Sequence, residues 1–161
     1  MARLFEEESG RGPAVTDELV RLAEERLGVR LPPEYVALLR TCNGGRPLRR
    51  CYRTLQPTSW APDHIEIESV LGVGYEDGID GRYGSRYLIH EWGYPDIGVV
   101  ICDTPSGGHD AVMLDYSAVG ASGRPRVVYV DDDRSVQTLA TTFDAFWNGL
   151  TLCSQFRGGL D

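Results

Sequence analysis

The stretch that decides the fold reads Leu27-Gly28-Val29-Arg30-Leu31-Pro32-Pro33-Glu34-Tyr35, continues through Leu38-Leu39 and closes with Asn43-Gly44-Gly45. Gly28 is a natural end for one helix, and the proline pair suits the first turn of the next. Apolar residues then recur at helical spacing from Tyr35 to Cys42. Asn43 and Gly44 tolerate the left-handed backbone that ends a helix. The stretch therefore predicts two amphipathic helices joined by a short turn.

Outward from this stretch, the chain is expected to form one domain over residues 15–150. The first helix should begin after Thr16, because Asp17 and Glu18 then occupy the first turn, where acids are favoured. Residues 1–14 contain two glycines and a proline and are expected to be a flexible N-terminal arm. Residues 151–161 are expected to be a C-terminal tail.

The rest of the chain alternates β-rich segments with turns. Residues 64–68 alternate apolar with polar side chains, and three further β-rich runs at 97–102, 111–116 and 126–130 predict an antiparallel meander. Residues 87–90 are expected to form a short strand, and the Gly-, Asp- and Tyr-rich residues 72–86 a long surface loop. Apolar residues between 136 and 150 follow helical spacing and predict a last helix.

These elements predict an α+β fold, with a central antiparallel meander sheet packed by N-terminal helices and a C-terminal helix. A chain of 161 residues needs neither a disulfide nor a metal to fold. The four cysteines, Cys42, Cys51, Cys102 and Cys153, are scattered and form no C-x-x-C pair. We therefore expect buried thiols, with no disulfide and no zinc site, and we expect no cofactor.

Charge is concentrated in the middle of the chain. The net charge is −8 overall, but residues 61–118 hold two arginines and eleven acidic residues, a net charge of −9. Such a block repels nucleic acid and anionic membrane and attracts basic partners; the alternative is that these acids only keep the protein soluble. No run approaches the ~20 apolar residues of a membrane span, and residues 6–8 are acidic where a signal peptide is apolar. These features predict a cytoplasmic protein.

A polar cluster at residues 102–115 is the main candidate for chemistry. Asp103, His109, Asp110 and Asp115 can be read as metal ligands or as an acid–base group, but the glycines and Pro105 favour a plain hairpin loop. A triad of Ser106, His109 and Asp110 lacks the strand–turn–helix context that such a nucleophile needs. Cys102 ends an apolar strand and is expected to be buried. The glycines at 72–81 match neither a phosphate loop nor a calcium loop.

The quoted stretch resembles the opening of the SUKH superfamily, in its Smi/Knr cell-wall-assembly-regulator branch. The resemblance covers about residues 14–150. It includes Trp60, Trp92-Gly93, Asp103, the turn Gly107-Gly108-His109-Asp110, the two following strands, and Phe143 with Trp147 in the closing segment. All 16 basic residues are arginine, which suggests a GC-rich bacterial genome.

The resemblance implies an α+β domain that binds protein and has no catalytic residues, so we expect no enzyme. Many bacterial members look like immunity proteins that block a polymorphic toxin, often a nuclease, in the cytoplasm of the cell that makes it. Fungal relatives act in signalling for cell-wall assembly, which makes a regulatory or scaffold module the alternative. The sequence does not fix the oligomeric state.

Charge and resemblance together suggest a partner-binding face for a basic toxin domain. Tyr and Trp beside acids are common at protein interfaces. The alternative is that Trp92 and Tyr94 close the edge of the core. The expected face consists of Glu76, Asp77, Asp80, Glu91, Trp92, Tyr94, Asp96 and Asp110.

Overall fold

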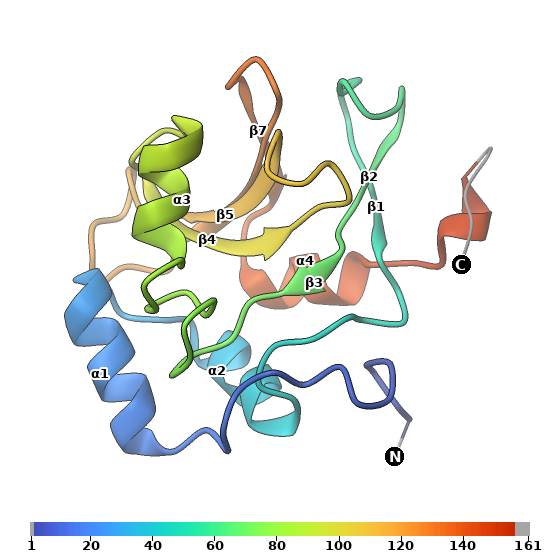
Figure 1. The fold of residues 1–161 in the computed structure, drawn as a ribbon. Coiled ribbons are helices and arrows are strands. Elements are labelled where there is room, and N and C mark those ends of the chain that lie inside the picture. Colours follow the sequence, from blue (N-terminus) through green and yellow to red (C-terminus); the bar gives the residue numbers. More distant parts are fainter. Residues whose placement is uncertain (1, 157–161) are drawn as a thin grey trace.

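A five-stranded antiparallel sheet forms the centre of the protein (Figure 1). The structure is a computed structural model, which describes residues 2–156. The sheet has the order β3-β4-β5-β6-β7, and β1 and β2 pair separately. In chain order the elements are α1 (Asp17–Leu27), α2 (Pro33–Thr41), β1 (Cys51–Arg53), β2 (His64–Glu66), β3 (Ser69–Val70), α3 (Ser85–Trp92), β4 (Gly98–Asp103), β5 (Ala111–Asp115), β6 (Arg126–Val130), β7 (Val136–Ala140), α4 (Phe143–Gly149) and the short 3-10 helix η1 (Cys153–Gln155). The α+β fold and its antiparallel meander are confirmed.

Local sequence signals set the ends of the first helix pair. The Thr16 hydroxyl accepts a hydrogen bond from the Leu19 backbone N–H at 3.2 Å, and Gly28 ends α1 in the left-handed region with φ 71°. Tyr35 on α2 is fully buried and donates its hydroxyl to the Leu71 carbonyl at 2.5 Å. Local signals therefore set the ends of the two helices, and both attach to the core, α1 through the buried Ala23 and α2 through Tyr35.

The centre of the sheet is covered on both faces, since all five residues of β5 are buried. Helix α3 packs against β4, whereas α4 packs against β6 and β7. Helices α2 and α4 meet through Tyr35 and Phe143, whose rings contact edge to face at 5.1 Å. No helix within residues 2–156 is long and apolar enough to cross a membrane.

The predicted last helix is only half helical. Residues 136–140 form strand β7, which pairs with β6, and helix α4 begins at Phe143. The Thr142 hydroxyl caps α4 by accepting a hydrogen bond from the Ala145 N–H at 3.1 Å. Val136, Leu139 and Ala140 follow helical spacing, but pairing with β6 supplies backbone hydrogen-bond partners for residues 136–140 and makes them a strand.

The predicted strand at 87–90 is wrong, because these residues lie inside α3. Gly84 precedes this helix and Gly93 ends it with φ 67°, while Leu88, Ile89 and Trp92 pack against the core at helical spacing. The segment at 72–84 is irregular as expected. It is not a simple surface loop, because Val73 and Ile79 are fully buried.

Asn43 of the quoted stretch holds this irregular segment in place. Its side-chain amide donates to the carbonyls of Pro13 and Val73, both at 2.8 Å, and its side-chain oxygen accepts from the Val73 N–H at 2.9 Å. Replacing Gly72 or Gly44 would also place a Cβ 2.2 Å from Asn43 or from Tyr75, respectively. The amide thus joins the N-terminal segment, the end of α2 and the approach to α3.

Replacing Asn43 with alanine is expected to lower the free energy of unfolding by about 2–3 kcal/mol, because three hydrogen bonds at a buried site lose their partner. Urea denaturation followed by circular dichroism measures the change. The exposed Asn148→Ala is the control, with an expected change within about 0.5 kcal/mol. Equal changes in the free energy of unfolding for the two variants would contradict a stabilising role for the Asn43 side chain.

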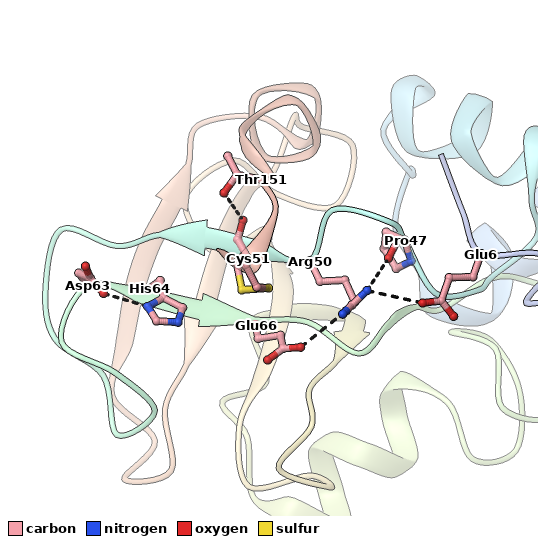
Figure 2. The surroundings of a disulfide bond; sticks show 9 residues. Glu6, Pro47, Arg50, Cys51, Asp63, His64, Glu66 and Thr151 are labelled. Carbon is pink, nitrogen blue, oxygen red and sulfur yellow. Dashed lines mark hydrogen bonds and ion pairs between the residues drawn. A yellow bond between two sulfur atoms is a disulfide. The ribbon is translucent and has the colours of Figure 1, made fainter. Parts of the chain in front are cut away.

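The expectation of no disulfide is wrong. Cys51 of β1 and Cys153 of η1 form a disulfide across 102 residues of sequence (Figure 2). Spacing along the chain does not reveal this pair, because only the fold brings the two segments together. Cys42 and Cys102 are free, and Cys102 is fully buried as expected. Burial raises the pKa of the Cys102 thiol well above its usual value.

Both end segments contact the body of the domain. In the segment expected to be a flexible arm, Phe5 is buried, pairs with Pro47 in a β-bridge and stacks on Trp147 at 5.6 Å. In the expected tail, Thr151 forms a bridge with Cys51, and the Phe156 ring stacks on His64 at 4.2 Å. Residues 157–161 of the expected tail lie outside the described residues.

Candidate functional site

Helix α3 presents a polar outer side to solvent. Its inner side is fixed to the sheet, where the Ser85 hydroxyl accepts a hydrogen bond from the Val100 N–H at 2.8 Å. Leu88, Ile89 and Trp92 pack on the core. The exposed residues of this eight-residue helix are Arg86, Tyr87, His90 and Glu91.

The segment before α3 extends this outer side. Glu76 and Asp77 are exposed at its turn, and the Tyr83 N–H donates to the Glu76 carbonyl at 3.0 Å. The rings of Tyr83 and Tyr87 are both exposed and contact each other edge to face at 5.2 Å. Tyr83, Tyr87 and Glu91 are spaced four residues apart, so they follow one side of α3 and its approach.

Four exposed acids lie in α3 and in the segments beside it, together with the exposed arginines Arg82 and Arg86, and Arg82 stacks on Tyr83 at 5.2 Å. Elsewhere acids are paired with arginines, as in Asp17–Arg40 and Glu34–Arg124, both at 2.6 Å. Some exposed acids form no ion pair and no side-chain hydrogen bond with any described residue. They include Glu76, Asp77, Glu91 and Asp96. We call these four residues, with Tyr83 and Tyr87, the α3 face.

Three residues of the expected face are instead internal. Only 2% of the Asp80 side chain is exposed, and it accepts a hydrogen bond from the Gly74 N–H at 3.0 Å. Tyr94 is buried and donates its hydroxyl to the Gly108 carbonyl, and burial raises the pKa of Tyr94 to about 12. Asp110 is also buried. These side chains support the fold and are not available to a partner.

Asp110 is the acceptor for three hydroxyl groups. Thr104 and Ser106 donate to one carboxylate oxygen, and Tyr129 of β6 donates to the other. This arrangement ties the 104–110 turn to the middle of the sheet. Burial, and to a lesser degree the hydrogen bond to the Asp110 carboxylate, raises the pKa of Tyr129 far above its usual value.

Trp92 takes an intermediate position, partly buried beside the 104–110 turn. A Cβ on Gly108 would lie 2.4 Å from the Trp92 ring, and His109 contacts that ring edge to face at 5.4 Å. Arg134, which the sequence analysis did not single out, donates to the carbonyls of Trp92 and His109 at 2.9 and 2.8 Å. Arg134 thereby fixes the C-terminal end of α3 against this turn.

The model of the SMI1/KNR4 family (SUKH-1) matches residues 14–149. The chain belongs to this family. The resemblance seen in the sequence is therefore confirmed at the level of the family. A search of curated proteins and a search of solved structures found no match.

In this SUKH-1 protein, the polar cluster that suggested chemistry is dispersed. Asp103 ends β4 opposite Ser69 and accepts two hydrogen bonds from it, whereas Asp115 ends β5 opposite Gly98. Burial alone would raise the pKa of Asp115, but hydrogen bonds from Ser117 and Arg126 outweigh it and lower the pKa. Asp103 and Asp115 therefore lie at opposite ends of the β4–β5 pair and do not form one site.

The suggested triad is not assembled either. Ser106 donates to Asp110, while the exposed His109 lies on Trp92. Within the described part of the chain, the acidic, His and Cys side chains close enough to share a metal ion are Cys51 with Glu66 and Cys153, and Asp131 with Asp132 and Asp133. Neither group includes a residue of the polar cluster.

The two tyrosines of the α3 face, Tyr83 and Tyr87, were not among the residues expected for the partner-binding face. The available signal was their spacing with Glu91, at positions 83, 87 and 91. That signal is readable only once residues 85–92 are known to be helical. The expectation of a strand there placed successive side chains on alternate faces.

Proposed function

We propose that this SUKH-1 protein is a non-catalytic immunity protein that neutralises a basic, nuclease-type toxin in the cytoplasm of the bacterium that makes both. The observation that carries the proposal is the set of exposed acids around α3, Glu76, Asp77, Glu91 and Asp96, which form no ion pair with a described residue and outnumber the exposed Arg82 and Arg86. Membership of the family supports protein binding in general. Family membership does not identify the partner, and we propose that it is a toxin.

The charge suits this partner for a physical reason. A nuclease binds phosphates through a basic surface, and carboxylates can occupy that surface in place of phosphate. Opposite charge also speeds encounter, to about 10⁸ M⁻¹s⁻¹ or more at low salt. An acidic face of this kind disfavours nucleic acid and anionic membrane as partners.

Anchoring of the α3 face supports tight binding. The segment before α3 is held by Asn43, by Asp80 and by the Tyr75 hydroxyl, which accepts from the Gly72 N–H at 2.8 Å. A surface that is already ordered loses little conformational entropy on association. Tyr83 and Tyr87 add aromatic area of the kind that contributes most at interfaces.

The absence of a catalytic role is part of the proposal. The candidate catalytic side chains are engaged in internal contacts, as with Asp110 and its three hydroxyl donors. Cys102 is fully buried with a raised pKa, which disfavours the reactive thiolate. These contacts favour a binding domain over an enzyme.

The test reverses the charge of the α3 face. The variant Glu76→Lys/Asp77→Lys/Glu91→Lys/Asp96→Lys is compared with wild type for capture of a nuclease from the source bacterium and for inhibition of the captured nuclease. We expect the dissociation constant to rise about 100-fold or more and inhibition to be lost. Wild-type affinity should also fall as salt rises.

A control reverses four exposed acids outside the α3 face: Glu7→Lys/Asp17→Lys/Glu18→Lys/Glu25→Lys. These acids pair with arginines, so circular dichroism first checks that this variant is folded. The control changes the net charge equally, so an unchanged affinity here assigns the effect to the α3 face. Equal losses in both variants would reduce the proposal to a general charge effect. A third outcome is that the protein captures only partners whose binding does not change with salt, and inhibits none of them. That result would favour the regulatory module.

A further inference from the structure

The disulfide lies beside the carboxylate of Glu66, which also contacts Arg50. Cys51 and Glu66 are directly opposite each other in the β1–β2 pair, and η1 brings Cys153 to the same place (Figure 2). The two Sγ atoms and a Glu66 carboxylate oxygen all lie within 4.8 Å of one another. Three potential ligand atoms therefore converge from three separate elements.

The surroundings favour an ordered, charged site. Arg50 is 6% exposed, and its Nε lies 3.6 Å from Glu66 and has no hydrogen-bond partner. Its guanidinium also lies 3.6 Å from Glu6, and it donates to the Pro47 carbonyl at 3.4 Å. Arg50 is thus a buried cation fixed behind Glu66, with one donor still to be satisfied.

We propose that the reduced protein binds one zinc ion between Cys51, Cys153 and Glu66, in place of the disulfide. A dithiol reductant first converts the disulfide to two thiols and is itself oxidised to a disulfide. Zinc then displaces one proton from each thiol and bonds to the two thiolates and the carboxylate. Water supplies the fourth ligand, entering beside Glu66, whose side chain is 20% exposed.

Geometry and charge both fit this ion. Zinc takes sulfur and oxygen ligands at about 2.3 and 2.1 Å in a tetrahedron, so its ligand atoms lie roughly 3.5–3.8 Å apart. The reduced sulfurs need only separate to that distance within the 4.8 Å cluster. Two thiolates and one carboxylate carry three negative charges; zinc offsets two of them, and the Arg50 guanidinium, which Glu6 also contacts, offsets part of the third. Arg50 also orients Glu66, as groups behind metal ligands commonly do.

The reducing cytoplasm is where such a site has consequences, because cytosolic thiols are kept reduced. The pair would then hold the C-terminal segment 151–156 through zinc inside the cell and through the disulfide under oxidising conditions. This inference does not depend on the α3 face or on a toxin. Its residues lie in the β1–β2 pair and η1, outside the α3 face.

The test uses cobalt(II) as a spectroscopic probe and zinc as competitor. The full chain is reduced with a phosphine, freed of metal with a chelator and titrated without oxygen. We expect one cobalt per chain, with the thiolate-to-cobalt absorption of a tetrahedral site, displaced by one equivalent of zinc. Zinc should also raise the melting temperature of the reduced protein but not that of the oxidised protein.

Oxidised wild type is the principal control, since it is the same folded chain without thiolates. Cys51→Ser and Cys153→Ser should abolish the absorption, Glu66→Gln should weaken binding about tenfold or more, and Cys42→Ser should leave it unchanged. If the cysteine variants do not fold, the comparison of reduced wild type with oxidised wild type and with Glu66→Gln still tests the zinc site. A reduced protein that gives no thiolate absorption overturns the proposal. So does metal binding that is equal in the oxidised and reduced proteins, as binding at Asp131, Asp132 and Asp133 would be.

Discussion

Replacing Asp110 with alanine is expected to lower the free energy of unfolding by about 3–5 kcal/mol. The substitution leaves the Tyr129 hydroxyl buried without its acceptor and leaves the buried Thr104 hydroxyl with only Ser106 as a side-chain partner, at 2.8 Å. A hydrogen bond to a charged group contributes about 1.5–3 kcal/mol, and a buried polar group left without a partner adds its desolvation cost. Urea denaturation, followed by both tryptophan fluorescence and circular dichroism, measures the change.

Two further variants test the source of this effect. Tyr129→Phe removes one donor and should cost about 1–2 kcal/mol, less than Asp110→Ala. Asp96→Ala removes an exposed carboxylate and should change stability by no more than about 0.5 kcal/mol. If the free energy of unfolding of Asp110→Ala lies within about 1 kcal/mol of the wild-type value, the desolvation cost of the carboxylate offsets its three hydrogen bonds.

Loss of the Cys51–Cys153 disulfide is expected to lower stability by about 4 kcal/mol, which corresponds to a fall of roughly 10 °C in melting temperature. The cross-link closes a loop of 102 residues and so restricts the unfolded chain strongly. In the described structure, its two half-cystines and Phe156 form a small apolar cluster separate from the main core. Segment 151–156 therefore depends on the cross-link for much of its attachment.

Melting of the oxidised and reduced proteins, both with a chelator present, measures this effect without a contribution from zinc. The double variant Cys51→Ala/Cys153→Ala should match the reduced protein, and Cys42→Ala should match the oxidised one. Hydrogen exchange should become faster in residues 151–156 on reduction, while β4–β6 stay protected. Unchanged melting on complete reduction would contradict a stabilising role for the cross-link.

Local sequence patterns predicted a helix or strand correctly where one secondary-structure signal dominated. Gly28 and the proline pair defined α1 and α2, and the three β-rich runs became β4, β5 and β6 with their antiparallel pairing. They failed where tertiary pairing overrode the local pattern. Val136, Leu139 and Ala140 follow helical spacing, but pairing with β6 makes residues 136–140 a strand.

The candidate site shows the same division. Sequence analysis identified the acidic, aromatic segment around α3, and Glu76, Asp77, Glu91 and Asp96 are indeed exposed. It also included Asp110 and Tyr94, which differ from these residues only in what surrounds them in space. An aspartate is the same letter whether it faces water or three buried hydroxyls, so burial and ion pairing are not readable from its position in the chain.

The sequence by itself determined the family, the fold class and the acidic middle of the chain, because helix ends, strand alternation and charge are local properties. Tertiary structure alone decided which acids remain unpaired and which are buried. It also decided that Cys51 meets Cys153 and Glu66. These contacts join residues far apart in the chain, and their partners are set by how the sheets and helices pack, which no local pattern records.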